Sequence, residues 1–118
     1  MNEEIKSMLC DKIIDNGDVI PVAHFTYKGS SKKFITWVML EERLGLSAND
    51  EPLCSICLVD IDIFFDGNYL GILNEVKKIM KNNDWVWTGD SPEMYETDTG
   101  LYHRTISFEK ERNILWRE

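Results

Sequence analysis

Two short patterns near the middle of the chain have residue types and spacing that suit chemistry. Cys54-Ser-Ile-Cys57 matches the C-x-x-C string of metal knuckles and redox pairs, which need both sulfurs on one side of a turn or helix start. Asp60 and Asp62 form a pair of carboxylates, a type that binds a divalent ion or does acid–base work. Each pattern must be judged against the element that carries it.

Both patterns fall in Leu53–Phe65, which has no Gly or Pro and is rich in β-branched and aromatic residues. A strand points alternate side chains to opposite faces, so Asp60 and Asp62 share one face while their apolar neighbours share the other. The two cysteines, three positions apart, point to opposite faces, which favours structural thiols over a metal or redox pair. Asp60 and Asp62 are roughly 7 Å apart on a strand. No third ligand lies nearby in the sequence, so we interpret the pair as a solvated or subunit-facing acidic edge.

This strand is unusually long. Thirteen residues at about 3.3 Å each would span roughly 43 Å, whereas about five or six residues is typical. The length predicts a β-bulge, or an arm that protrudes from the domain at one end.

No catalytic motif accompanies these patterns. The only histidines are His24 and His103, and the sequence contains no G-x-S-x-G, H-E-x-x-H or phosphate-binding glycine loop. Tyr102-His103-Arg104 is polar enough for an active site, but the polar face of a strand explains it equally well. We expect neither catalysis nor a cofactor.

The composition restricts the class of protein. A chain of 118 residues, 43% hydrophobic and 29% charged, is expected to form one domain, residues 1–118, with a core that needs no metal or disulfide. The net charge of −8 and the lack of a basic stripe argue against nucleic-acid binding. Met1–Glu4 shows no signal-peptide pattern, and three cysteines indicate free thiols in a reducing compartment.

The remaining elements follow from periodicity and turn residues. Apolar residues at helical spacing predict helices over Asn2–Asn16 and Asn68–Lys81, and alternation predicts strands elsewhere. Pro21 makes the first strand an edge strand, because proline cannot donate to a sheet. The predicted strands are Asp18–Tyr27, Lys33–Leu40, Leu53–Phe65, Trp85–Thr88, Met94–Glu96 and Leu101–Lys110.

Lys33–Leu40 and Leu53–Phe65 are expected to form a long hairpin, joined by Glu41–Pro52 as a polar loop of the long kind that is often functional. The predicted fold class is α+β: a mostly antiparallel or mixed sheet with a long β-hairpin, and two helices packed on one face.

Four tryptophans in a chain of this length exceed what core packing requires, and tryptophan is enriched at protein interfaces. The apolar residues of the charged tail, residues 110–118, are a further candidate for contact with a neighbouring subunit. We expect interface contacts at Trp37, Arg43, Asp60, Asp62, Trp87, Tyr102 and Trp116.

Several stretches together carry a family resemblance. They are Tyr27-Lys-Gly-Ser-Ser-Lys-Lys-Phe-Ile-Thr-Trp37, Val59-Asp-Ile-Asp-Ile63, Asp66-Gly-Asn-Tyr69 before a helix that ends in lysines, and Tyr95-Glu-Thr-Asp-Thr-Gly-Leu-Tyr-His103. In this order they resemble the tail terminator proteins (tail completion, head–tail joining) of long-tailed bacteriophages and prophages, from about Val19 to Arg112.

The resemblance implies a structural protein of the virion tail, assembled in the bacterial host cytoplasm. It implies a homo-oligomer, generally a hexameric ring, that caps the tail tube, ends its polymerisation and joins it to the head–tail connector or stopper protein. It implies no enzyme and no cofactor. DNA would pass through the lumen without specific binding. Glu41–Pro52 and the Gly89–Gly100 turns are natural candidates for contact with tube or connector.

Two other classes remain open from the residues alone. One is a monomeric acidic binding module, such as a DNA mimic or an inhibitor of a basic partner. It would bind basic proteins in a salt-dependent way. The other is a small metal-dependent enzyme that uses Asp60 and Asp62, which would bind a divalent ion measurably.

Overall fold

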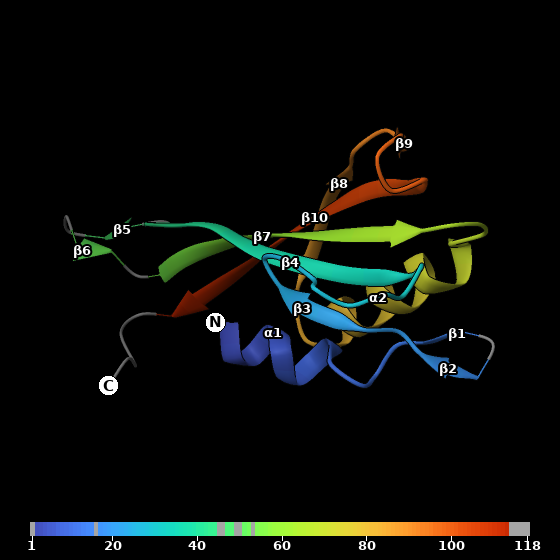
Figure 1. Ribbon diagram of the computed structural model, residues 1–118. Coiled ribbons are helices and arrows are strands. Elements are labelled where there is room, and N and C mark those ends of the chain that lie inside the picture. The colour runs from blue at the N-terminus through green and yellow to red at the C-terminus, as the bar shows by residue number, and fades with distance from the viewer. Residues whose placement is uncertain (1, 16, 45–46, 49–50, 53, 114–118) are drawn as a thin grey trace.

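The computed structural model describes residues 2–15, 17–44, 47–48, 51–52 and 54–113. Its main feature is a set of three long strands with two helices on one side of them (Figure 1). In chain order the elements are α1 (Asn2–Leu9), β1 (Ile14–Asp15), β2 (Asp18–Val19), β3 (Val22–His24), β4 (Phe34–Leu44), β5 (Ser47–Ala48), β6 (Glu51–Pro52), β7 (Cys54–Phe65), α2 (Leu70–Asn82), β8 (Val86–Asp90), β9 (Met94–Glu96) and β10 (Leu101–Asn113).

The main sheet has the strand order β3-β4-β7-β10-β8, and β9 pairs with the first residues of β10. Strand β7 pairs antiparallel with both β4 and β10, whereas the short β3 runs parallel to β4. The mixed sheet and the two helices confirm the predicted α+β class. The long hairpin of β4 and β7 is confirmed, as is the edge position of the strand that follows Pro21.

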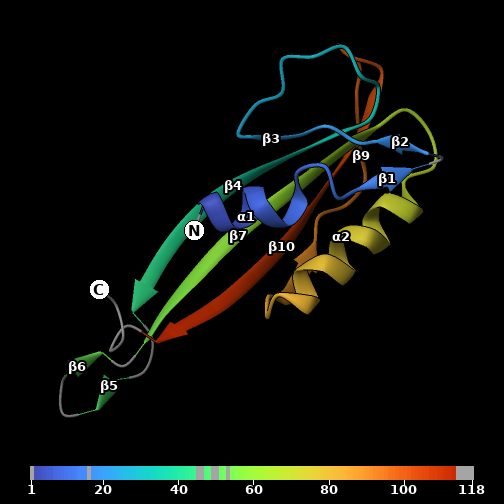
Figure 2. The same ribbon diagram turned by 90° about the horizontal axis from the view of Figure 1, so that it is seen from below.

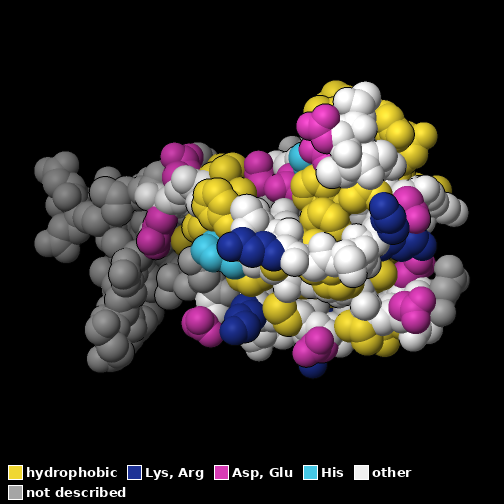
Figure 3. Space-filling view, in the orientation of Figure 1, with side chains coloured by type: hydrophobic (Ala, Val, Ile, Leu, Met, Phe, Trp, Pro, Cys, Tyr) yellow, Lys and Arg dark blue, Asp and Glu magenta, His cyan; other side chains and the backbone are white. Residues whose placement is uncertain are grey.

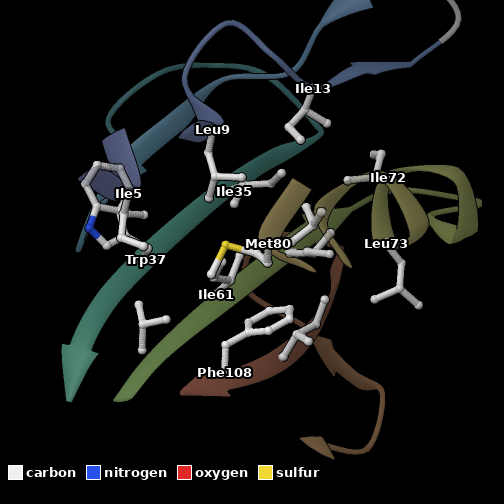
Figure 4. Packing of buried hydrophobic residues seen from close by; sticks show 14 of the residues in the cluster. Ile5, Leu9, Ile13, Ile35, Trp37, Ile61, Ile72, Leu73, Met80 and Phe108 are labelled. Carbon is white, nitrogen blue, oxygen red and sulfur yellow. The ribbon is translucent and has the colours of Figure 1, made fainter. Parts of the chain in front are cut away.

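Strand β7 alternates as its sequence predicts. Val59, Ile61 and Ile63 are fully buried on one face, while Asp60 and Asp62 are half-buried on the other. The buried face packs against both helices (Figure 4). The core contains Ile5, Leu9 and Ile13 from the N-terminal segment, Ile72, Leu73, Val76 and Met80 from α2, and Ile35, Trp37, Cys57, Val59, Ile61, Ile63, Phe65, Ile106 and Phe108 from the strands.

The opposite side of the sheet carries neither helix, and we call it the open face (Figure 1). The register of β4, β7 and β10 defines its described residues, because residues directly opposite one another point to the same face. They are Phe34, Thr36, Val38 and Glu41 of β4; Ile56, Leu58, Asp60, Asp62 and Phe64 of β7; and His103, Thr105, Ser107, Glu109 and Glu111 of β10.

The molecule is elongated, with principal extents of 53 × 26 × 23 Å. The ends of β4, β7 and β10 nearest the β5–β6 hairpin lie beyond the helices and form an arm, which Figure 2 shows from below. This matches the sequence-based expectation of a strand too long for the body of one domain.

The first helix is shorter than predicted. It ends at Leu9 rather than Asn16, and Asp11 just beyond it has a left-handed backbone conformation with φ 64°. The chain then continues so that Ile13 still reaches the core, and β1 and β2 form a small hairpin around Gly17, which has φ 85°. Ile13 lies four positions after Leu9, so its burial imitates helical spacing in the sequence.

The predicted polar loop Glu41–Pro52 is wrong over most of its length. β4 continues to Leu44, because β7 supplies pairing partners as far as Ser55. β5 and β6 then pair as a short hairpin. The expected bulge occurs in β4, between Met39 and Glu41, rather than in β7.

The last strand is also longer than predicted, since β10 continues past Lys110 to Asn113. Lys110 itself donates from Nζ to Oε1 of Glu4 at 2.7 Å and so ties the strand to α1. Of the tail expected to contact a neighbour, Ile114–Glu118 lies outside the described residues.

Candidate functional site

The open face has two rows in which a carboxylate of β7 lies opposite a hydroxyl of β10. Ser107 Oγ donates to Asp60 Oδ1 at 2.6 Å, and Thr105 Oγ1 donates to Asp62 Oδ1 at the same distance. The antiparallel register places Asp60 opposite Ser107 and Asp62 opposite Thr105. Hydrogen bonds to a carboxylate are the strong kind, so these pairs fix the two acidic side chains on the face.

His103 completes a hydroxyl–imidazole–carboxylate group with Thr105 and Asp62. Its Nε2 lies 3.2 Å from Asp62 Oδ1 and 3.5 Å from Thr105 Oγ1. Nucleophilic catalysis requires that the hydroxyl proton point to the imidazole. Here the shorter hydrogen bond of Thr105 goes to the carboxylate instead. The group is therefore arranged to hold the strands together rather than to activate a nucleophile.

A stack of four rings crosses the end of the open face away from the arm. The centroids of Tyr27 and Phe34 are 4.4 Å apart, those of Phe34 and Phe64 are 4.6 Å apart, and those of Phe64 and His103 are 4.3 Å apart. The stack joins the segment after β3 to β4, β7 and β10. The half-buried rings of Tyr27, Phe34 and Phe64 give this end of the face an aromatic surface.

Towards the arm, the same face becomes acidic. Glu41 and Glu109 lie opposite Leu58, and Glu111 lies opposite Ile56. With Asp60 and Asp62, five carboxylates from three strands share the face. Figure 3 shows one side of the molecule, on which hydrophobic, acidic and basic side chains are interspersed.

Trp37, predicted at an interface, is a core residue instead. Its side chain is 3% exposed and lies beside Ile5 in the close-up of the core (Figure 4). Its position on β4, opposite Ile61, points it to the helices. The apolar alternation of β4 is two-sided in the sequence, so the sequence alone does not tell which face is covered.

Trp87 and Tyr102 are accessible, with 53% and 36% of their surface exposed. Trp87 donates from Nε1 to Asp90 Oδ1 at 2.7 Å. Asp90 also accepts from Arg104 Nη2 at 3.0 Å, and Arg104 donates from Nη1 to Tyr69 Oη at 2.7 Å. The hydrogen bond to Tyr69 raises the pKa of Arg104, and the hydrogen bonds through Asp90 hold Trp87 at the sheet edge.

Tyr102 belongs to a separate aromatic group on the helix side. Its ring stacks on Phe65 at 5.4 Å and meets Tyr95 edge-on at 5.0 Å. Asp60, Asp62, Trp87 and Tyr102 are therefore not neighbours in one site. The side chain of Arg43 and the whole of Trp116 lie outside the described residues.

Among the described residues, the Cys54-Ser-Ile-Cys57 pattern forms no metal or redox site. Cys57 is buried in the core, and the side chain of Cys54 lies outside the described residues. Within the described part of the chain, no three His, Cys, Asp or Glu side chains gather where they would hold a metal ion. None of the helices described is long and apolar enough to cross a membrane.

Phe25 is a residue that the sequence interpretation missed. It directly follows β3, is 65% exposed and has φ 71°. Its apolar character fits the alternation of a strand, so the sequence gives no signal of its exposure. The hydroxyl partners of Asp60 and Asp62 were missed for a similar reason, because they become visible only when the register of β7 and β10 is known.

No protein-family model matches the chain, and no curated protein matches it.

Proposed function

We propose that the protein is a structural subunit of a phage-type tail terminator. It forms a ring that caps the tail tube, ends its polymerisation and joins it to the head connector. The observation that carries the proposal is that the first and last of the stretches on which the family resemblance rests meet across the central strand. Tyr27 and Phe34 from the first, Phe64 beside the second and His103 from the last form one aromatic stack on the open face.

The shape of the chain supports the same function. A ring of identical subunits needs two different surfaces on each subunit, which bind head to tail. An elongated sheet with an arm, and with edges formed by β3 and β8, offers such surfaces. The exposed Leu40 at the bulge of β4 and Trp87 at the β8 edge are the kind of apolar side chains that subunit contacts cover.

The acidic open face suits the lumen of such a ring. Asp60 and Asp62, two neighbouring carboxylates of β7, repel the phosphates of DNA, which carries about one negative charge per 1.7 Å of duplex. DNA would therefore pass without adhering to the wall. Asp60 and Asp62 are held in place by Ser107 and Thr105, so their charges face a fixed direction.

The same carboxylates keep a second candidate open, a monomeric module that presents an acidic face to a basic protein. The two functions differ in the molecule that the acidic face contacts. In the ring it faces passing DNA and stays free of protein, whereas in the module it is the binding surface.

A tube-growth experiment tests the proposal. Tail tube subunits are polymerised with and without the purified protein, and tube lengths are measured from negative-stain images. A terminator is expected to bind tube ends and to stop elongation at substoichiometric amounts relative to tube subunits. Elongation that continues unchanged at a protein excess would contradict the proposal.

The double variant Asp60→Asn/Asp62→Asn tests whether the open face lines the lumen and repels DNA. We expect rings to form normally but to associate with DNA more strongly at low salt, because two repulsive charges per subunit are removed while the amide oxygens still accept the hydroxyl hydrogens. Asp66→Asn, an exposed change in the turn before α2, is the control. Loss of the ring in the double variant would show that these residues are interface residues instead.

A further inference from the structure

Phe25 combines exposure with backbone strain. Its 65% exposure is the highest among the large hydrophobic residues described. Its φ of 71° lies in the left-handed region, which bulky side chains avoid. The surrounding hydrogen bonds hold this conformation, since Phe25 N–H donates to Trp37 O and Thr26 N–H donates to His24 O, each at 2.8 Å. Strain of this kind is concentrated at functional sites.

The ring of Phe25 is supported from one side. His24 meets it edge-on with centroids 5.8 Å apart, and His24 in turn lies 5.1 Å from the buried ring of Trp37. Phe25 is therefore a fixed apolar knob at the end of β3, on one edge of the main sheet.

A groove lies at the other edge of the sheet, along β8. It is lined by Lys77, Lys81, Trp85, Val86, Trp87 and Phe108 and has a volume of about 340 Å³. Trp85 and Phe108 are buried, and Trp87, which pairs with Phe108, is more than half exposed on the same side; Val86 pairs with Glu109, so its side chain points to the open face and only its backbone borders the groove. This volume is near the lower end of the range for small-molecule sites, about 300–1,000 Å³, so it suits a single side chain rather than a helix.

The chemistry of the groove favours an aromatic occupant. Its lining is mostly apolar and aromatic, and two lysines stand at its rim on a strongly acidic protein. The Lys77 ammonium already lies 4.4 Å from the centroid of the Trp87 ring. Ammonium groups are attracted to the faces of aromatic rings, and an additional ring entering the groove would gain the same interaction.

We propose that Phe25 of one copy inserts into the β8 groove of the next copy. The knob and the groove lie on opposite edges of one sheet, so each copy carries one of each and the contact is heterologous. The inference rests on the ring assembly of the proposed function and names the contact that closes it.

The two sides of this contact, the knob and the groove, can be tested by separate variants. Phe25→Gly removes the knob and should not unfold the chain, because glycine favours the left-handed backbone; Phe25→Asn serves as a second knob-less variant. Trp87→Glu replaces an apolar side chain of the groove by a charge at an exposed edge position. Val19→Glu, which adds the same charge at an exposed residue of β2 away from the groove, is the control.

Sedimentation velocity over a concentration series measures self-association. We expect Phe25→Gly, Phe25→Asn and Trp87→Glu each to weaken it by about tenfold or more, as the loss of a central aromatic anchor does, and Val19→Glu to leave it unchanged. Thermal unfolding of each variant checks that the chain is folded.

Mixing the variants gives the decisive result. A Phe25→Gly copy keeps its groove, and a Trp87→Glu copy keeps its knob, so an equal mixture should form heterodimers and nothing larger. A mixture that stays monomeric overturns the contact. Self-association that survives both single variants also overturns it and assigns the groove to another occupant.

A failure of this contact can be distinguished from a failure of the proposed terminator function. If the mixture dimerises but the wild-type chain leaves tube ends bare, the contact is right and the terminator function is wrong. If the wild-type and Phe25→Gly chains cap tubes equally well, the function is supported and this contact is wrong.

Discussion

Tyr27 lies directly against Gly29, and this contact supports the aromatic stack. Its hydroxyl accepts the backbone N–H of Ser31 at 3.1 Å, and its ring lies on Phe34. A Cβ at position 29 would overlap the Tyr27 hydroxyl. The turn therefore requires glycine because of a close approach, not because of its φ angle.

Gly29→Ala is expected to destabilise the chain by about 1–3 kcal/mol, the usual effect of forcing extra volume into a packed site. The Tyr27 ring must move, which breaks its bond to Ser31 and its stacking on Phe34. Gly67→Ala is the control, because nothing lies within 4 Å of a Cβ there. Urea midpoints measure the difference, and equal midpoints for both variants would show that Tyr27 adjusts freely.

The two tryptophans predicted at interfaces should respond differently to truncation. Trp37→Ala is expected to lose about 3–5 kcal/mol of unfolding free energy, because a large buried side chain leaves a cavity. Trp87→Ala should lose only about 1 kcal/mol in the isolated chain, mainly its hydrogen bond to Asp90. If Trp37→Ala is as mild as Trp87→Ala in chemical denaturation, the placement of Trp37 in the core is wrong.

At the scale of elements, strands were predictable where the sequence alternates and less so where it does not. The faces of β7 follow from its own residues, since Val59, Ile61 and Ile63 alternate with carboxylates. The true length of β4 does not, because Glu41–Leu44 is polar enough for a loop and becomes a strand only through pairing with β7. Pairing with β7 therefore makes this segment a strand, although its local composition favours a loop.

The candidate site was predictable only in part for the same reason. Asp60 and Asp62 were placed on one face from sequence alone. Their partners Ser107 and Thr105 depend on a strand register that spans more than forty residues of chain, which no local pattern specifies. The strained conformation of Phe25 likewise results from hydrogen bonds to β4.

An ion pair ties the β1–β2 hairpin to the start of β4. Lys33 Nζ lies 2.7 Å from Asp15 Oδ2. The hydrogen bond to Asp15 raises the pKa of Lys33, outweighing the effect of burial, which lowers it. A raised lysine pKa stabilises the folded state below the unfolded pKa of about 10.4, and this stabilisation is lost as pH rises through the folded value.

Wild type should therefore be more stable than Lys33→Met at pH 7, by up to about 1 kcal/mol for a partly exposed pair. The difference should shrink as pH rises from about 10.4, where Lys33 of the unfolded chain loses its proton, through the raised pKa of the folded chain. Urea midpoints of both chains at several pH values give the comparison. Lys32→Met, an exposed neighbour, is the control. A difference that grows with pH would show that packing, not charge, dominates at this position.

At the scale of the whole molecule, the proposed ring would cover surfaces that a single chain leaves exposed. The sheet has a knob at one edge and a groove at the other, the bulge of β4 exposes Leu40, and five carboxylates from three strands share the open face. A ring would cover the edges and leave the acidic face towards the lumen.

The most direct test of the central claim is negative-stain imaging of tail tubes incubated with the protein, combined with light scattering of the same sample without tubes. We predict ring-shaped density on tube ends, with rings of several copies in solution or assembled at the tube. A chain that remains monomeric, leaves every tube end bare and binds a basic protein in a salt-dependent way would contradict the ring and favour the acidic binding module.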